Sequence, residues 1–185
     1  MAGANRVRII GGAWRSRLLS FPSRGDLRPT PDRVRETLFN WLGQDLTGKT
    51  CLDLFAGSGA LGFEAASRGA RRVVLVERDA QTVRALGASR DALQATAVEL
   101  KRADALEFLR DDADVYDVVF VDPPFKAGLW PRLAPLLPRR LAPDALVYYE
   151  SGDRPDLAPD WVAHRQGQAG QVRYQLLKRV QIYEQ

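Results

Sequence analysis

The chain has little sulfur and little imidazole: one cysteine, Cys51, and one histidine, His164. A single thiol cannot form an internal disulfide or a thiolate metal site, so a disulfide scaffold and structural zinc are excluded and a reducing compartment is expected. No apolar run approaches the roughly 18 residues that a membrane-spanning helix needs, and the longest are short, as at Val118–Val121. The sequence therefore predicts a cytoplasmic protein with no membrane segment and no metal.

What the chain does contain is the composition of an ordinary globular protein. Hydrophobic residues make up 45% of it and charged residues 27%. This supplies enough apolar side chain for a buried core and excludes intrinsic disorder for most of the chain. A length of 185 residues corresponds to about one domain, which excludes a large multi-domain protein.

Positive charge is concentrated at the start of the chain. Residues 1–40 hold eight arginines against three acidic residues, a net charge of +5, whereas the other 145 residues hold 19 basic and 20 acidic residues, a net charge of −1. Clustered positive charge is what steers a protein to a polyanion and neutralises its phosphates. A solvated arginine-rich surface is the alternative interpretation.

A targeting peptide is a third interpretation of this segment, because the first 25 residues contain arginines and serines but no acidic residue. However, Arg6–Ile9 alternates with period two, which favours a strand over the amphipathic helix of a transit peptide. After Gly11 and Gly12, Trp14–Phe21 is expected to be a second extended piece with Arg15 and Arg17 on one face. We therefore expect residues 1–29 to form a small basic β extension.

A helix is predicted next, over Asp32–Gln44. Thr30 is expected to cap it with its hydroxyl, and Pro31 to occupy its first position, where the missing N–H is harmless. One face of this helix is apolar and is expected to pack on the main body. Its residues are Val34, Leu38, Trp41 and Leu42.

From Thr50 onward, short apolar runs alternate with helical segments, a pattern typical of a parallel sheet with right-handed crossovers. The expected strands are Thr50–Phe55, Arg72–Glu77, Val98–Lys101, Asp117–Val121 and Ala145–Glu150. The expected helices are Gly59–Arg68, Ala80–Gln94, Ala105–Arg110 and Leu129–Leu141, of which the last is interrupted by three prolines. Trp161–Gln166 and Val172–Tyr183 are expected to form a closing hairpin. Residues 30–185 are therefore predicted to be one α/β domain.

A glycine-rich segment lies where the first parallel strand ends and its helix begins. Gly57, Gly59 and Gly62, with Glu77 further on, match the pattern G-x-G-x-x-G of dinucleotide-binding loops. Asp53 argues against that interpretation, because a carboxylate at the strand end would repel a pyrophosphate and attract a cationic part of a ligand.

With this acidic residue, the segment resembles the first motif of the class I S-adenosylmethionine-dependent methyltransferases. The resemblance implies a Rossmann-like seven-stranded, mostly parallel sheet with an antiparallel last strand, and S-adenosylmethionine as cofactor. It places Asp53 near the methionine end, Glu77 on the ribose hydroxyls and Asp104 on the adenine amine, although Asp104 can equally cap the helix that follows it. The implied cofactor-binding residues are Asp53, Phe55, Ala56, Gly57, Gly59, Glu77, Arg78, Asp104 and Ala105.

The most specific motif is Asp122-Pro123-Pro124-Phe125, directly after the fourth predicted parallel strand. An aspartate at the carboxyl end of a parallel strand lies where ligands bind in open α/β sheets. The prolines stop the strand and leave carbonyls free to accept hydrogen bonds, and Phe125 offers a flat face on which a base can stack. The alternative is a proline-terminated strand followed by a turn.

This tetrad resembles the D/N-P-P-F/Y/W motif of methyltransferases that act on exocyclic or amide nitrogens. The resemblance implies that Asp122 and the carbonyl of Pro123 hold the target NH2 so that its lone pair faces the methyl group, and that Phe125 stacks on the base. No metal and no covalent enzyme intermediate are required. The motif serves adenine and guanine alike, whereas glutamine methyltransferases prefer asparagine at the position of Asp122.

The N-terminal part resembles the RsmD family of bacterial small-subunit rRNA guanine-N2 methyltransferases, on the segments Arg8–Arg15 and Leu27–Leu42. The resemblance implies transfer of a methyl group to N2 of a guanine in 16S rRNA, of the guanine-966 type, in the assembled or assembling small subunit. It weakens over residues 126–141 and 152–164. The arginines expected to contact RNA are Arg6, Arg8, Arg15, Arg17, Arg28 and Arg33.

Three other functions remain open at this point. An N6-adenine methyltransferase on DNA or RNA would use the same Asp122 tetrad. An NAD-dependent oxidoreductase would use the glycines and Glu77, but the sequence shows no separate catalytic domain and no proton donor other than His164. A non-enzymatic RNA chaperone would explain the arginines and leave the Asp122 tetrad without a role.

Overall fold

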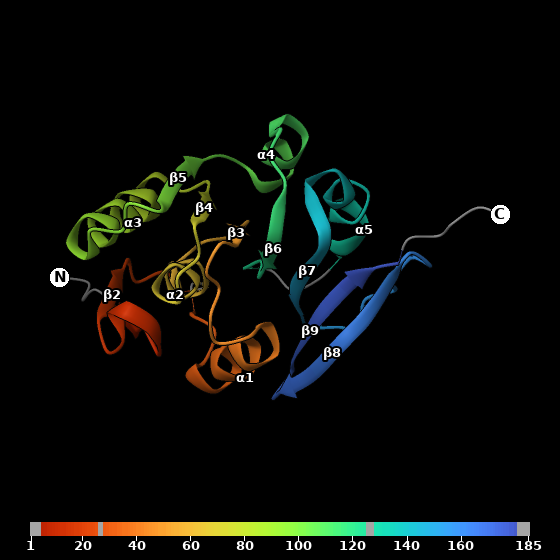
Figure 1. Cartoon of the computed structure of the whole chain (residues 1–185), viewed down its shortest axis with the longest axis horizontal. Coiled ribbons are helices and arrows are strands. Elements are labelled where there is room, and N and C mark those ends of the chain that lie inside the picture. The colour runs from red at the N-terminus through yellow and green to blue at the C-terminus, as the bar shows by residue number, and fades with distance from the viewer. Residues whose placement is uncertain (1–4, 26–27, 125–127, 181–185) are drawn as a thin grey trace.

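A computed structural model describes residues 5–25, 28–124 and 128–180 of the chain. Its centre is a seven-stranded sheet in the order β5-β4-β3-β6-β7-β9-β8 (Figure 1). The five strands from β5 to β7 are parallel, and β9 pairs antiparallel with both β7 and β8. The strands are β3 (Thr50–Asp53), β4 (Arg72–Glu77), β5 (Val98–Arg102), β6 (Tyr116–Val121), β7 (Leu141–Ser151), β8 (Trp161–Ala169) and β9 (Val172–Arg179).

Helices cover both faces of this sheet. The helices are α1 (Asp32–Leu42), α2 (Ala60–Ser67), α3 (Ala80–Leu93), α4 (Ala105–Asp111), α5 (Trp130–Leu133) and the 3-10 helix η2 (Leu137–Arg140). Buried side chains of α1, α2 and α3 form one hydrophobic cluster, and those of α4, α5 and η2 form another. The two clusters lie on opposite faces of the sheet, because successive side chains of a strand point to opposite faces. In β3, Cys51 belongs to the first cluster and Leu52 to the second. The predicted α/β fold, with a seven-stranded, mostly parallel sheet, is confirmed.

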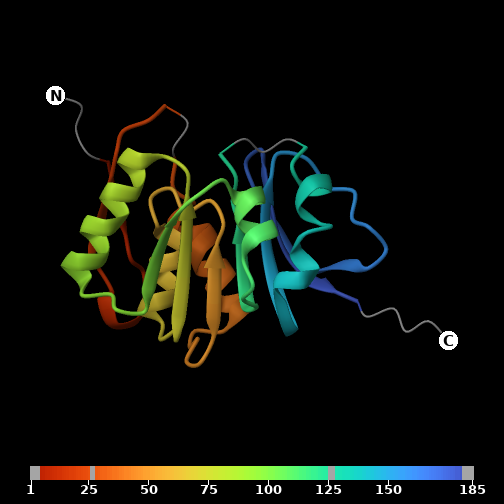
Figure 2. The same cartoon turned by 90° about the horizontal axis from the view of Figure 1, so that it is seen from above.

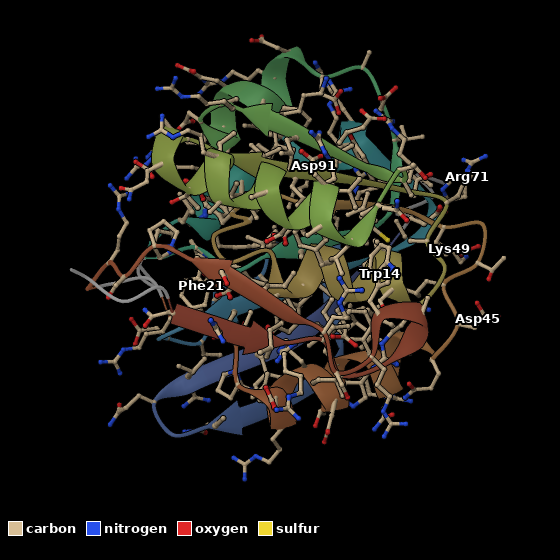
Figure 3. All side chains as sticks on the ribbon, turned by 90° about the vertical axis from the view of Figure 1, so that its left-hand side faces the viewer. Trp14, Phe21, Asp45, Lys49, Arg71 and Asp91 are labelled. Carbon is tan, nitrogen blue, oxygen red and sulfur yellow. The ribbon has the colours of Figure 1, made fainter. Side chains whose placement is uncertain are left out.

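The N-terminal residues form a two-stranded hairpin of β1 (Asn5–Arg8) and β2 (Leu18–Phe21) outside the main sheet. The hairpin and α3 lie at one end of the sheet, and β8 and β9 lie at the other (Figure 2). The hairpin runs beside α3, with Phe21 near one end of the hairpin and Trp14 near the other (Figure 3). Its buried residues Val7 and Leu19 belong to the same cluster as α1 and α2.

A buried carboxylate joins this hairpin to the helix that follows the glycine-rich loop. Glu64 of α2 is fully buried and accepts hydrogen bonds from the backbone N–H groups of Ile10, at 2.9 Å, and Gly11, at 2.8 Å. It also pairs with the guanidinium groups of Arg35, at 3.4 Å, and Arg68, at 3.0 Å. Arg35 is itself fully buried, so one of the eight N-terminal arginines balances an interior charge and is not exposed to a polyanion.

Two N-terminal predictions are wrong. The segment Trp14–Phe21 is extended only from Leu18, because the short 3-10 helix η1 (Gly12–Trp14) and the left-handed backbone of Ser16 form a tight turn before it. Arg15 and Arg17 therefore do not share a strand face. Thr30 does not cap α1, since Pro31 holds that position and makes no side-chain capping bond.

The other predicted elements are present with shifted ends. Leu129–Leu141 is divided into α5 and η2, as its prolines predict. The strand expected at Val172–Tyr183 ends at Arg179, and its last predicted residues, from position 181 on, lie outside the described residues. Within the described ranges, no helix is both long and apolar enough to cross a bilayer.

Candidate active site

A cavity of about 700 Å³ opens at the carboxyl edge of the parallel strands. It is centred on β3, which pairs with β4 on one side and β6 on the other. The chain leaves β3 toward β4 and returns later to β6, so the connections diverge at this point and leave a crevice, which is where ligands bind in open α/β sheets. Residues at or just after the carboxyl ends of β3, β4, β5, β6 and β7 line this cavity together with residues before α1.

The glycines of the loop after β3 have different roles. Gly57 lines the cavity, with φ 53°, in the left-handed region that glycine adopts without strain. Gly59 also has a left-handed backbone, and a Cβ atom there would lie 2.5 Å from Cδ2 of Phe63. A Cβ atom on Gly62 would lie 2.1 Å from Cδ2 of Leu75. Gly62 therefore allows α2 to pack closely on β4, and Gly59 leaves room for the side chains of Phe63 on α2 and Leu86 on α3.

Asp53, the last residue of β3, is buried beneath this loop. Its Oδ2 accepts a hydrogen bond of 3.1 Å from the backbone N–H of Gly62. Its Oδ1 is buried and has no hydrogen-bond partner among the described residues. Burial, and secondarily the nearby charge of Asp122, raises the pKa of Asp53 to about 7. A buried carboxylate oxygen without a hydrogen-bond partner favours a ligand that brings a positive charge or an N–H group to it.

Two more carboxylates lie along the cavity at the ends of neighbouring strands. Glu77, at the end of β4, accepts hydrogen bonds from the backbone N–H groups of Gly57, at 3.2 Å, and Asp79, at 2.9 Å. Asp104 follows β5 and caps α4 by accepting from Leu106 and Glu107. The capping role foreseen for Asp104 is confirmed, and both residues also line the cavity.

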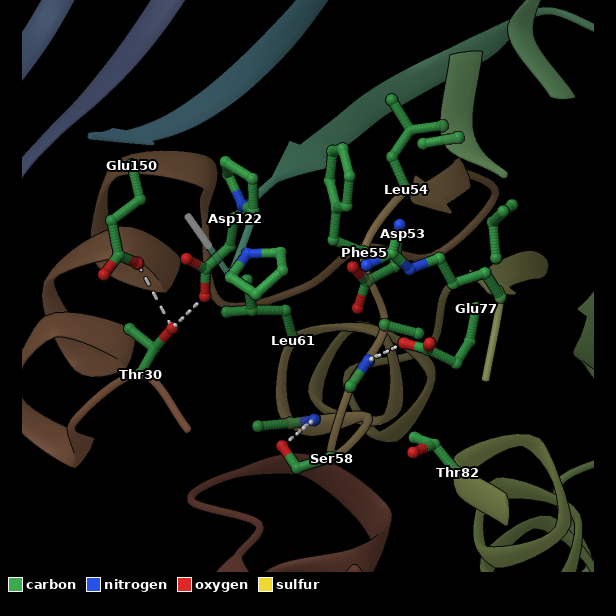
Figure 4. Close-up of a pocket in the computed structure, with 18 of the residues that line it drawn as sticks. Thr30, Asp53, Leu54, Phe55, Ser58, Leu61, Glu77, Thr82, Asp122 and Glu150 are labelled. Carbon is green, nitrogen blue, oxygen red and sulfur yellow. Dashed lines mark hydrogen bonds between the residues drawn. The ribbon is translucent and has the colours of Figure 1, made fainter. Parts of the chain in front are cut away.

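A third group of polar residues faces them across the cavity (Figure 4). Asp122 is the first residue after β6, and its Oδ2 accepts a hydrogen bond of 2.8 Å from the hydroxyl of Thr30. The same hydroxyl lies 3.3 Å from Oε2 of Glu150, which also accepts a bond of 3.0 Å from the hydroxyl of Tyr148. Asp122, Thr30 and Glu150 all line the cavity.

The structure brings most predicted site residues to this one cavity. The predicted residues that line it are Asp53, Phe55, Ala56, Gly57, Glu77, Arg78, Asp104, Ala105, Asp122 and Pro123. Gly59 directly precedes α2 and does not line the cavity, and Phe125 lies outside the described residues. Their proposed roles remain predictions.

The predicted RNA-contacting arginines are dispersed. Arg28 lines the cavity, together with Arg24, Arg78 and Arg132. Arg6, Arg8, Arg15 and Arg33 are exposed away from it, and Arg17 donates a 3.2 Å hydrogen bond to the carbonyl of Ala92 on α3. Of the four arginines at the cavity, Arg24 and Arg28 belong to the basic first 40 residues, whereas Arg78 and Arg132 lie outside that segment. In the described part of the chain, no group of His, Cys, Asp or Glu side chains is arranged to hold a metal ion.

Sequence reasoning missed two cavity residues, Thr30 and Glu150. Thr30 was assigned to a helix cap, which is the commonest role of a threonine before a helix. Glu150 ends an apolar run, and its position one residue beyond the paired residues Val121 and Tyr149 places it beside Asp122. A carboxylate at the end of a central parallel strand was the available signal.

Comparison with known proteins gives concordant findings. The model of a family described as conserved hypothetical protein 95 matches residues 7–178. The chain is 44% identical to ribosomal RNA small subunit methyltransferase D of Escherichia coli, over 96% of this chain and 92% of that one. It is 41% identical to the protein of that name from Haemophilus influenzae, over 92% of each. The solved structure of a putative methyltransferase, yhhF, from Escherichia coli aligns with a TM-score of 0.87 at 44% identity, covering 95% of this chain and 99% of that one.

Proposed function

Because the chain belongs to the RsmD family of methyltransferases, we propose that it transfers a methyl group from S-adenosylmethionine to the exocyclic N2 of one guanine in 16S rRNA. Its family relationship supports a methyltransferase of ribosomal RNA. The base, the nitrogen atom and the guanine-966 position are the finer parts of the proposal. The substrate is the assembled or assembling small subunit, and the reaction takes place in the cytoplasm.

The residues of the cavity fit S-adenosylmethionine as methyl donor. The methionine part of that molecule carries positive charge, which the buried Asp53 carboxylate, with its unpartnered Oδ1, would attract. Glu77 offers two acceptor oxygens for the ribose diol, and Asp104 an acceptor for the adenine amine. When bound, S-adenosylmethionine supplies an electrophilic methyl group.

The observation that carries the proposal is the relation between Asp53 and Asp122. They follow adjacent strands, β3 and β6, line one cavity and are close enough for the charge of Asp122 to raise the pKa of Asp53. Asp122, which would hold the target amine, therefore lies beside Asp53, which suits the methyl donor. This arrangement supports direct transfer between two bound molecules.

Asp122 and the carbonyl of Pro123 accept hydrogen bonds from the target NH2. An aryl amine is a weak nucleophile because its lone pair is delocalised into the ring, and these two bonds turn the lone pair toward the methyl group. As the nitrogen gains the methyl group it becomes positively charged, and the Asp122 carboxylate stabilises that charge until a proton leaves to Asp122 or to water.

The test is methylation of small subunits purified from a strain that lacks this activity. With labelled S-adenosylmethionine, nucleoside analysis should give N2-methylguanosine, and N6-methyladenosine would overturn the guanine assignment. Asp122→Ala should abolish transfer and leave S-adenosylmethionine affinity within a few fold, because its hydrogen bonds go to the target. Asp111→Ala, which removes an exposed carboxylate at the end of α4, is the matched control and should retain full activity.

A further inference from the structure

A second carboxylate lies next to Asp122 in the wall of the cavity. In the parallel pair β6 and β7, Val121 is opposite Tyr149, so the residues that follow them, Asp122 and Glu150, lie side by side. Asp122 is the first residue after β6, whereas Glu150 is still part of β7 and pairs with Tyr174 of β9. Glu150 is only 4% exposed, yet it lines the cavity with Asp122. A buried carboxylate is costly unless hydrogen-bond donors satisfy it, so its position beside the target-binding aspartate requires an explanation.

Two hydroxyl groups lie against this carboxylate. The Tyr148 hydroxyl donates to Oε2 of Glu150, and burial together with the charges of Glu150 and Asp122 keeps the pKa of Tyr148 well above its ordinary value, so it remains a donor. The Thr30 hydroxyl lies between the two carboxylates, 2.8 Å from Asp122 and 3.3 Å from Glu150. These distances to one shared atom keep the two carboxylate oxygens within about 6 Å of each other.

Two acceptors no more than about 6 Å apart can both be reached by a base with two adjacent donors. The Watson–Crick edge of guanine presents N1–H beside its N2 amine, so both groups donate. The same edge of adenine presents the N6 amine beside N1, which carries a lone pair and accepts. A carboxylate has about four lone-pair positions, so Glu150 can accept from a base while it accepts from Tyr148.

We propose that Glu150 accepts the N1–H of the target guanine while Asp122 accepts its N2 amine, and that Glu150 thereby selects guanine over adenine. The proposal rests on the proposed function, since it concerns the same cavity and reaction. With adenine in that place, the N1 lone pair would face a carboxylate and lose the hydrogen bond. A site built to bind a donor rejects an analogue that lacks it, because the buried acceptor is left unpaired.

The experiment compares guanine with 2-aminopurine at the target position of small subunits assembled in vitro. 2-Aminopurine keeps the exocyclic amine at C2 but has a lone pair at N1. The wild-type protein should methylate it with kcat/KM lower by roughly 10- to 100-fold, the effect of one hydrogen bond to a charged group. In Glu150→Gln, the kcat/KM values for guanine and 2-aminopurine should lie within a few fold of each other. The glutamine amide can donate to N1 of 2-aminopurine or accept from N1–H of guanine.

Two controls separate recognition from structure. Glu107→Gln changes an exposed carboxylate on α4 and should leave the ratio unchanged. S-adenosylmethionine affinity and thermal unfolding of Glu150→Gln should match the wild type. If Glu150→Gln reduced kcat/KM equally for both bases, Glu150 would only support Thr30 and Asp122, and the proposal would fail.

The comparison of guanine with 2-aminopurine in the wild-type protein tests the proposal even if Glu150→Gln does not fold. Wild-type protein that methylates 2-aminopurine as well as guanine would overturn the proposal and leave the proposed function intact. If no N2-methylguanosine formed on the guanine subunits, the proposed function itself would fail.

Discussion

The Thr30 hydroxyl donates a 2.8 Å hydrogen bond to Oδ2 of Asp122, across 92 residues of sequence. This contact connects the segment that leads into α1 with the aspartate that follows β6. Thr30 is buried, and its hydrogen bond restricts the orientation of the half-buried Asp122 carboxylate. The N-terminal part of the chain therefore positions a group of the candidate active site.

Replacing Thr30 by valine removes the hydroxyl and keeps the branched shape. We expect kcat to fall roughly 10- to 100-fold, since a hydrogen bond to a charged group contributes about 1.5–3 kcal/mol to the orientation of Asp122. The affinity for S-adenosylmethionine, measured by calorimetry, should stay within a few fold. Thr30→Ser keeps the hydroxyl and should restore most of the activity, and a serine variant as impaired as the valine variant would contradict the positioning role.

The raised pKa of Asp53 predicts a pH-dependent cost in stability. In the folded protein its pKa is about 7, against an ordinary value of 3.8, so the folded state holds a proton that the unfolded state has lost between these values. The free energy of unfolding contributed by Asp53 therefore falls as pH rises through this window. Asp53→Asn lacks this titration and should be more stable than the wild type at about pH 8, by an amount on the order of a few kcal/mol.

Urea unfolding of the two proteins without cofactor, at about pH 4 and pH 8, measures this difference. The gain in stability should nearly disappear at about pH 4, where Asp53 is protonated in the folded state and about half protonated in the unfolded state. The same variant should bind S-adenosylmethionine more weakly, because the charge that attracts the methionine part is gone. A constant difference in stability across the pH range would mean that Asp53 does not titrate in this way.

Glu64 is predicted to be one of the most important residues for stability. Replacing it by alanine leaves the buried guanidinium of Arg35 and the N–H groups of Ile10 and Gly11 without their acceptor. Loss of one partner of a buried ion pair costs about 3–5 kcal/mol, which urea unfolding would detect. Glu107→Ala, at an exposed position on α4, should change the unfolding free energy by about 0.5 kcal/mol or less.

The arginines of the N-terminal hairpin are predicted to contact RNA phosphates. Replacing Arg6, Arg8, Arg15 and Arg17 by alanine should lower affinity for the small subunit and reduce the log-log salt slope by roughly 3. Cofactor binding should not change. Lys49→Ala is a suitable single control, because Lys49 precedes β3 at the edge of the sheet opposite the cavity. A loss of folding stability at unchanged RNA affinity would identify the hairpin as a packing element.

The cavity arginines provide a comparison. Arg28→Ala with Arg132→Ala should reduce the salt slope by roughly 1.5 if both contact phosphate. If only this pair affects RNA affinity, the RNA surface lies at the cavity and not on the hairpin.

Features that depend on local pattern can be predicted from the sequence. Alternating strands and helices predicted the sheet, and its parallel strands necessarily bring their carboxyl ends to one edge. The residues at those ends, Asp53, Glu77, Asp104 and Asp122, could therefore be assigned to one site without knowing their distances. The glycines and prolines were equally informative, because the backbone conformations they allow or forbid do not depend on distant parts of the chain.

The pairing of polar groups inside the protein depends instead on contacts between distant parts of the folded chain. Local rules assign Thr30 to a helix cap and Glu64 to a solvated helix face, since capping and solvation are the usual ways to satisfy such groups. In the folded chain, the hairpin covers Glu64, and the end of β6 brings Asp122 to Thr30. Burial then makes hydrogen bonds with distant partners stronger than the local alternatives, and no sequence pattern within a few residues of either side chain contains that information.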